Sequence, residues 1–396
     1  MNSVNSICII LGSGFSKPAG LPLAKEIDAF FTRNNVETLL KFSSGEWKWW
    51  DFANDAYRNN GRLNSDYIPY GYILNELVSA FIKANKEFIS YETFYQFVID
   101  GIKSKDFVQA IYQKAFDKSK EEDVIDKDER FYEDNTYAFR YPDASEIYNM
   151  INYLIDDLLY WRKSFDEFES FYFPFLSYII PFTEVNVITL NHDFLLEALF
   201  ENNGIEYTDG FSNEKSPLQS EDKINIKYFC GKFDSKFSII KLHGSIDVYK
   251  YIVSQQEGSM LYPTGEYIYF KTHDYYEKQK PVRVNPETGE IVQDFHWNIT
   301  PQFITGTRKE ELIANDKMYA CLYSEFEKRI HSSETLLIIG YSFGDEHVNN
   351  QIRSALTYEN LKKVINVNPF DKFPYNSDRI SILNINTLEE ISCENY

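Results

Sequence analysis

Short apolar runs that end in glycine or in polar residues recur along the chain, and they alternate with longer amphipathic segments. Apolar runs of this length predict buried parallel strands. Strands that alternate with helices predict an α/β fold with a Rossmann-like, doubly wound parallel sheet, in which ligands bind at the carboxyl ends of the strands. The predicted strands are Ile7–Leu11, Val185–Leu190, Ser238–Leu242, Leu336–Ile339 and Val364–Asn368.

The pattern changes between residues 35 and 180, where apolar residues recur at intervals of three and four and predict amphipathic helices. Tyr72–Asn85 and Ile147–Trp161 are clear examples, and Phe165–Ile180 is similar, although Pro174 should kink or break it. The polar stretch Lys118–Asn135 predicts a loop. We therefore expect a large helical insertion over residues 35–180, within a Rossmann-like domain formed by residues 1–34 and 181–396.

Further segments in the Rossmann-like part predict three helices and a group of hairpins. The helices are expected at Leu21–Thr32, with Pro22 in the first turn, at Asp193–Glu201 and at Lys317–Ile330. Residues 255–300 hold glycine and proline turns between aromatic stretches, which is typical of hairpins.

The turn after the first predicted strand reads Gly12-Ser13-Gly14-Phe15-Ser16-Lys17. Its two glycines permit a sharp turn and a close approach of the backbone to a ligand. A helix that begins here would direct free N–H groups towards a phosphate. The dinucleotide fingerprint has a third glycine where this chain has Lys17, so the turn alone does not identify a nucleotide site.

Composition narrows the function classes. The chain has 396 residues, 43% of them hydrophobic, and a formal net charge of −20, which disfavours direct binding to the phosphate backbone of nucleic acids. Its four cysteines, Cys8, Cys230, Cys321 and Cys393, lack CxxC spacing, so we expect reduced thiols and no metal site. We find no signal peptide and no run of ~18 apolar residues, and expect a soluble cytoplasmic protein without a membrane span.

Polar and glycine residues follow each predicted strand, and a parallel sheet would bring these groups together along one edge. The groups are Gly12–Ser16, Thr189-Leu190-Asn191-His192-Asp193, His243-Gly244-Ser245, Gly340-Tyr341-Ser342 and Asn366-Val367-Asn368.

The order and spacing of these groups resemble the sirtuin-like superfamily. The resemblance implies that Gly12, Ser13, Gly14, Phe15 and Ser16 hold the pyrophosphate of NAD. It implies that Thr189, Asn191 and Asp193 orient nicotinamide and its ribose, and that His243 is the catalytic histidine. It also implies that the adenosine half is held by Gly340, Ser342, Asn366 and Asn368.

The chain is more similar to the bacterial antiphage-defence branch of that superfamily. The turn Gly12–Ser16, Lys241-Leu242-His243-Gly244-Ser245 and Gly340-Tyr341-Ser342-Phe343-Gly344-Asp345 match motifs of that branch. The resemblance implies an NAD⁺ glycohydrolase that depletes NAD in abortive infection. It further implies a homo-oligomer that works with a HerA-type hexameric ATPase, and the aromatic-rich insertion is either a subunit contact surface or simply packed core.

The sequence departs from protein-deacylase sirtuins. Those enzymes carry a four-cysteine zinc module, which the four scattered cysteines cannot form. Leu190 and His192 replace residues of the family motif, and Ala24 and Lys25 stand where deacylases have Phe and Arg. An NAD-dependent protein deacylase and a non-catalytic module that senses NAD or ADP-ribose remain as alternatives.

Cleavage of the nicotinamide–ribose bond builds positive charge on the sugar, as in glycoside hydrolysis. The amide of Asn191 is suited to holding a water or a ribose hydroxyl, Asp193 can accept from the carboxamide, and His243 can serve as a general base. Asp193 and Asp345 are equally suited to capping helices. We expect structural or surface roles for His273, His296, His331 and His347.

Overall fold

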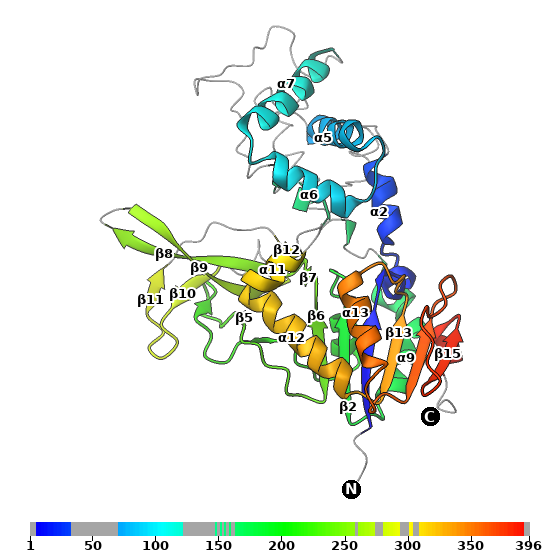
Figure 1. Ribbon diagram of the computed structural model, residues 1–396. Coiled ribbons are helices and arrows are strands. Elements are labelled where there is room, and N and C mark those ends of the chain that lie inside the picture. The colour runs from blue at the N-terminus through cyan, green and yellow to red at the C-terminus, as the bar shows by residue number, and fades with distance from the viewer. Residues whose placement is uncertain are drawn as a thin grey trace. The chain divides into compact units, whose positions relative to one another are not determined.

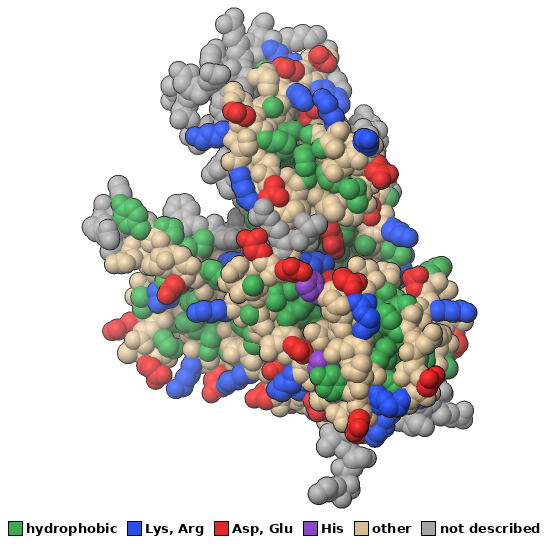
Figure 2. Space-filling model, viewed as in Figure 1, with side chains coloured by type: hydrophobic (Ala, Val, Ile, Leu, Met, Phe, Trp, Pro, Cys, Tyr) green, Lys and Arg blue, Asp and Glu red, His purple; other side chains and the backbone are tan. Residues whose placement is uncertain are grey.

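A computed structural model of the chain describes residues 5–32, 70–121, 147–303 and 309–391, with gaps at 149–150, 153, 156–157, 160–162, 258–259, 274–279 and 294–300. Among these residues no helix has the length and apolar character needed to cross a bilayer. The chain divides into two compact units. On the face drawn in Figure 2, basic and acidic side chains are interspersed among apolar ones.

A six-stranded parallel sheet forms the centre of the first unit (Figure 1), which confirms the predicted α/β class. Its strand order is β15-β14-β13-β1-β2-β6, so the order reverses on either side of β1, as it does in doubly wound folds. The strands are β1 (Ser6–Leu11), β2 (Glu184–Thr189), β6 (Phe237–Lys241), β13 (Thr335–Ile339), β14 (Lys363–Val367) and β15 (Ser381–Ile385).

Both faces of the sheet are covered, which explains why β1 is apolar at nearly every position. Ile7, Ile9 and Leu11 belong to the core on one face, together with residues of α9 (Phe173–Ile179) and α10 (Leu195–Asn202). Cys8 and Ile10 belong to the opposite core, which includes residues of α12 (Lys317–Ser332) and α13 (Glu346–Ala355).

Three antiparallel sheets accompany the parallel one. The four-stranded sheet has the order β3-β5-β9-β8, the three-stranded sheet β11-β10-β4, and the two-stranded sheet β12-β7. The hairpins predicted in 255–300 are confirmed for β8–β9 and β10–β11. The strands are β3 (Phe211–Ser212), β4 (Leu218–Gln219), β5 (Lys227–Phe229), β7 (Gly244–Ser245), β8 (Val248–Glu257), β9 (Met260–Lys271), β10 (Val282–Val284), β11 (Ile291–Gln293) and β12 (Gln302–Phe303).

Short helices complete the elements outside the helical unit. They are α1 (Ser13–Ser16), η1 (Lys17–Ala19), η2 (Phe165–Glu167), η3 (Glu169–Tyr172), α11 (Lys309–Asn315) and η4 (Leu388–Glu390). Pro174 lies in the first turn of α9, where proline is tolerated, so the predicted break falls before it, in η3.

The second unit is helical and comprises Pro22–Tyr160 with Thr305–Lys309. Its helices are α2 (Ala24–Phe31), α5 (Tyr70–Asn85), α6 (Tyr91–Gly101) and α7 (Lys105–Glu121), and the described residues of 147–158 are also largely helical. Phe94 joins α6 to its neighbours, with ring centroids 5.1 Å from Phe31 and 5.6 Å from Phe81. The two units divide at 21/22 and at 160/161. The domain boundaries predicted from the sequence, at 34/35 and 180/181, stay a prediction.

Three local expectations are corrected. The helix predicted from Leu21 begins at Ala24, because Leu23 is extended and its N–H donates to Glu26 Oε2 at 2.7 Å. Residues 118–121 are the last turn of α7 rather than a loop, and 122–135 lie outside the described residues. Strand β15 was not predicted, because its half-exposed residues lack a continuous apolar run.

Candidate active site

The glycine turn after β1 is packed against the end of β13. Gly12 N–H donates to Ile339 O at 3.0 Å, and Gly14 N–H donates to Gly340 O at 3.1 Å. A Cβ on Gly12 would lie 2.5 Å from Gly340 O, and one on Gly14 would lie 2.7 Å from Gly340 Cα. These glycines are therefore required for a close backbone approach to Gly340, and the predicted approach of the turn to a ligand stays a prediction.

The other residues of the turn have different surroundings. Phe15 is buried, and its ring packs against Tyr172 and Phe175 at centroid distances of 5.0 and 5.3 Å. Ser16 is also buried, whereas Ser13 is partly exposed. Phe15 thus anchors the turn in the core, while Ser13 leaves a hydroxyl near its surface.

Asn191 and Asp193, which follow β2, form hydrogen bonds with the Gly12–Ser16 turn. Asn191 Nδ2 donates to Gly12 O and to Ser16 Oγ, both at 3.0 Å, and its N–H donates to Thr189 Oγ1 at 3.1 Å. Asp193 accepts from Ser16 Oγ at 2.9 Å and from Leu195 N–H at 3.1 Å. These bonds fix the Asn191 amide, and its Oδ1 receives no hydrogen bond from the residues that the structure describes.

The Asp193 carboxyl is buried, and burial raises its pKa above the ordinary value despite the opposing effect of Lys241. Its two oxygens accept one bond each from Ser16 and Leu195, so Asp193 connects the glycine turn to the start of α10. The alternative role of N-cap is wrong for Asp193, because the N-cap of α10 is Phe194 and Asp193 precedes it. The proposed contact of Asp193 with a carboxamide stays a prediction.

His243 follows β6 and pairs with Asp345 at the start of α13. The distance from His243 Nε2 to Asp345 Oδ2 is 3.0 Å, and the two side chains are 6% and 7% exposed, so the pair is shielded from water. Asp345 Oδ1 caps α13 by accepting from His347 N–H at 3.0 Å and Val348 N–H at 3.2 Å. Since Asp345 is held by its helix, it can fix the orientation of the imidazole ring.

This His–Asp pair crosses the sheet. His243 follows β6 and Asp345 follows β13, and these strands are separated by β1 and β2, so the two segments must approach each other across the width of both strands. From the sequence, Asp345 was predicted only as a helix cap, and its contact with His243 was not predicted. The signal available was its place in the Gly340–Asp345 motif, six residues after the β13 strand.

The ends of β13 and β14 are also joined. Gly340 N–H donates to Val367 O at 3.0 Å, and Asn368 Nδ2 donates to Tyr341 O at 3.0 Å. Asn366 is fully buried within β14, and its Nδ2 donates to Asp371 O at 2.8 Å and Asn384 Oδ1 at 3.1 Å. Ser342 is exposed. Ser342 and Asn368 therefore belong to the sheet edge, whereas Asn366 secures the chain behind it.

The predicted site residues thus meet along the carboxyl edge of one sheet. Hydrogen bonds join β6 to β2 through Leu242 N–H and Thr189 O, β2 to β1 through Asn191, β1 to β13 through Gly14, and β13 to β14 through Gly340. His192 contributes its backbone carbonyl, which accepts from Ser245 Oγ at 3.1 Å and from Ile246 N–H at 3.0 Å.

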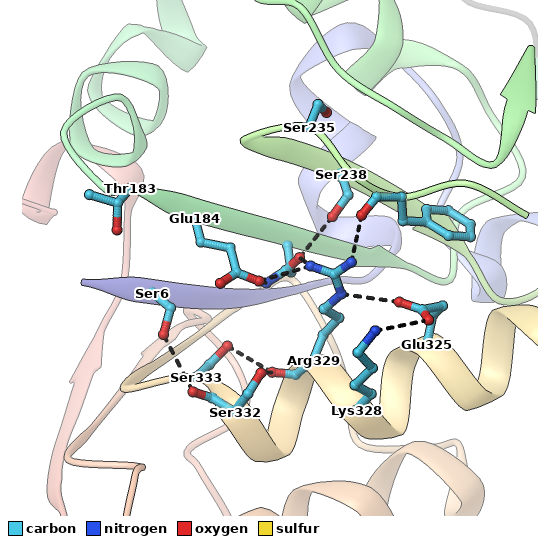
Figure 3. A network of polar contacts seen from close by, with 12 residues as sticks. Ser6, Thr183, Glu184, Ser235, Ser238, Glu325, Lys328, Arg329, Ser332 and Ser333 are labelled. Carbon is cyan, nitrogen blue, oxygen red and sulfur yellow. Dashed lines mark hydrogen bonds and ion pairs between the residues drawn. The ribbon is translucent and has the colours of Figure 1, made fainter. Parts of the chain in front are cut away.

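A hollow of about 810 Å³ lies at the opposite, amino edge, beside the start of β2 and the C-terminal half of α12. Arg329 is one of the residues that line it, and Figure 3 shows its polar contacts: it bonds to Glu184 at 2.8 Å, to Asn186 at 3.1 Å and to Glu325 at 3.1 Å. Arg329 also donates to Phe233 O. Because four acceptors surround this guanidinium, we assign it to fastening α12 to the sheet rather than to ligand binding.

Comparison with known proteins agrees with this geometry. Residues 185–372 match the family model of the SIR2-like domain, a stretch that holds Asn191, His243, Gly340 and Asn368. This part of the chain is similar to the SIR2-like domain.

Solved structures with a distant likeness include a Sir2 homologue in complex with NAD, at 11% identity and a TM-score of 0.35, covering 98% of this chain and 86% of that one. A structure on sirtuin substrate affinity has 12% identity and a TM-score of 0.30, with coverages of 98% and 92%. Sir2Tm bound to a propionylated peptide has 11% identity and a TM-score of 0.31, with coverages of 98% and 91%. No curated protein matches the chain.

Proposed function

We propose that the chain is an NAD⁺ hydrolase that converts NAD⁺ and water to nicotinamide, ADP-ribose and a proton. The observation that carries the proposal is the meeting of a fixed Asn191 amide with a buried His243–Asp345 pair at the carboxyl edge of a SIR2-like domain. An amide and an oriented imidazole are the groups required to hold a water and the ribose hydroxyls while the glycosidic bond breaks.

In this proposal NAD lies along the strand ends, across the reversal of strand order at β1. Ser13 and the backbone of the Gly12–Ser16 turn face the pyrophosphate, and Ser342 and Asn368 face the adenosine. Gly12, Gly14 and Gly340 shape this edge by packing together, while Phe15 and Asn366 support it from within.

The bond that breaks joins C1′ of the ribose to the nicotinamide nitrogen, and positive charge develops on the sugar as nicotinamide leaves with the bonding electrons. Asn191 Oδ1 accepts from the attacking water or from a ribose hydroxyl. Asp345 occupies His243 Nε2, so Nδ1 is the ring nitrogen left for a ribose hydroxyl or for the proton that water loses. Thr189 and Asp193 act indirectly, since both bind the segment that carries Asn191.

The first alternative is a protein deacylase, which the cysteines disfavour. Cys8 is fully buried in β1 among the apolar side chains of the core, which disfavours a role in a zinc module. The test is to incubate NAD with the protein, with and without an acetylated lysine peptide, and to measure nicotinamide. We expect equal release in both reactions; release that requires the peptide would establish the deacylase.

The second alternative is a module that senses NAD or ADP-ribose without cleaving it. Binding alone has no use for an oriented imidazole, so the His243–Asp345 pair favours an enzyme. Calorimetric titration with ADP-ribose separates the two: an enzyme variant His243→Ala should retain binding while losing nicotinamide release. A wild-type protein that binds NAD and leaves it intact would be a sensor.

The proposed biological role is depletion of NAD in antiphage abortive infection, supported by the motifs at Lys241–Ser245 and Gly340–Asp345. An unregulated NAD hydrolase would kill its host, so we propose a homo-oligomer gated by a HerA-type hexameric ATPase. Light scattering of the chain at micromolar concentration tests self-assembly, and a strict monomer argues against it. Complete NAD loss in uninfected cells that express this chain alone would show that no partner is needed.

A further inference from the structure

Behind the candidate active site lies a buried cluster of five charged groups, which we call the ionic cluster: Lys241, Lys271, Glu197, Asp209 and Asp247. Glu197 Oε1 accepts from Lys241 Nζ at 3.0 Å and from Lys271 Nζ at 3.1 Å. Lys271 Nζ also lies 2.7 Å from Asp209 Oδ2 and 3.5 Å from Asp247 Oδ2. Each of these side chains is at most 8% exposed.

The two lysines contact different parts of the chain. Lys241 is the last residue of β6, two residues before His243, and its Nζ donates to the backbone carbonyl of Asp193 as well as to Glu197. Asp193 lies two residues after Asn191. Lys241 therefore joins the segment that carries Asn191 to the strand that carries His243, whereas Lys271, at the end of β9, bonds to neither Asp193 nor β6.

Stability alone is a poor reason for such a cluster, because removing ions from water costs several kcal/mol for each ion and apolar replacements are often as stable. The cluster is nonetheless strongly coupled. Burial raises the pKa of Glu197, but Lys241 and Lys271 outweigh burial and hold it below its ordinary value. Both lysines are thus hydrogen-bonded to the same fully buried carboxylate, which gives Lys241 a defined direction and position.

We propose that Lys241 is a positioning residue for the reaction, one that sets the distance between Asn191 and His243 by bonding the β2–α10 segment to the end of β6. This inference rests on the proposed NAD hydrolysis. It goes beyond that function by assigning a role to the lysine of the Lys-Leu-His-Gly-Ser motif, whose Nζ bonds to Asp193 O and Glu197.

A change in this spacing should alter which acceptor captures the ribosyl cation. In a fixed methanol–water mixture, capture by water gives ADP-ribose and capture by methanol gives O-methyl-ADP-ribose; each reaction releases one nicotinamide and one proton. The ratio of these products is independent of the amount of active enzyme. A variant in which part of the protein is unfolded forms less of both products in the same proportion. A variant in which Asn191 or His243 is displaced changes the ratio of the two products.

The variants are chosen to separate position from stability. Lys241→Met combined with Glu197→Gln removes one positive and one negative charge, so the formal charge of the ionic cluster is unchanged. Lys241→Gln retains a donor for the Asp193 carbonyl. Lys271→Met is the matched control, because it removes the other buried lysine of the same cluster. Circular dichroism records the folded fraction of each variant.

We expect the product ratio to change at least threefold in the double variant, less in Lys241→Gln and not at all in Lys271→Met. Equal changes with both lysines, or unfolding of every variant, would make the ionic cluster merely structural and overturn the proposal. If wild-type protein forms neither product, the proposed function fails separately. The His243 ring resonances in NMR spectra then decide: they should shift in the double variant and not in Lys271→Met, and unchanged resonances would refute positioning.

Discussion

Substitution of Gly340 by alanine should disrupt the contact between the ends of β1 and β13. Gly340 has φ = +60°, and an added Cβ would lie 2.5 Å from Gly14 Cα and 2.6 Å from Gly14 C and Phe15 N. The atoms that it meets are backbone atoms of the glycine turn, which cannot rotate away as a flexible side chain can. The turn must therefore move as a unit.

The expected cost has two parts. A left-handed conformation costs a non-glycine residue about 1–2 kcal/mol, and overpacking typically adds about 1–3 kcal/mol. Gly289 is a matched control, because it has φ = +72° and no atom within 4 Å of its Cβ position. Gly340→Ala should thus lower the unfolding free energy by about 2–5 kcal/mol, and Gly289→Ala by about 1–2 kcal/mol.

Thermal unfolding followed by circular dichroism measures the difference, at about 2–4 °C for each kcal/mol in domains of this size class. Gly340→Ala should also weaken nicotinamide release in the part that remains folded, because the displaced turn carries Gly12 and Ser16, to which Asn191 bonds. Equal melting temperatures for the two variants would refute the argument that a backbone contact, rather than the positive φ alone, requires Gly340.

Three other substitutions test the site and the ionic cluster. His243→Ala should reduce NAD hydrolysis about 10²–10⁴-fold, the usual contribution of a general acid or base, while His273→Ala in the same assay should not. Asp345→Asn should retain the cap of α13, since asparagine caps as well as aspartate, and still lower turnover; unchanged turnover would remove Asp345 from the mechanism. Burial alone would raise the pKa of Asp247, but Lys271 and Lys241 outweigh burial and lower it from 3.8 to about 2. The ionised Asp247 carboxylate therefore stabilises the fold by about 2 kcal/mol above pH 3.8, and this contribution is lost as the pH falls towards 2. Chemical denaturation should show a smaller acid dependence for Asp247→Asn, and an identical dependence would contradict the assignment.

Much of the sheet could be predicted from the sequence, because buried parallel strands leave a simple pattern. The apolar runs beginning at Ile7, Val185, Ser238, Leu336 and Val364 correspond to β1, β2, β6, β13 and β14, shifted by at most one residue at either end. The edge strand β15 left no such pattern, since an edge strand with one exposed face does not need a continuous apolar run.

The sequence was sufficient to predict which strand ends form the candidate site. It was not sufficient to predict which side chains of the site contact one another. Parallel pairing alone explains why Asn191, His243 and Gly340 reach one edge. Asp345 and Lys241 were not assigned their contacts with His243 and Asp193, because these depend on how loops cross the sheet. Motif position could have suggested both residues, but only the fold shows what each one contacts.

We expect the carboxyl edge of this sheet to cleave NAD, and nicotinamide release tests this expectation most directly. Purified wild-type protein and Asn191→Ala, matched by circular dichroism, are incubated with NAD and no peptide, and nicotinamide and ADP-ribose are quantified by chromatography. Wild-type protein should form the two products in equal amounts, and Asn191→Ala should form neither. Intact NAD with the wild-type protein, or equal turnover by both proteins, would contradict the account.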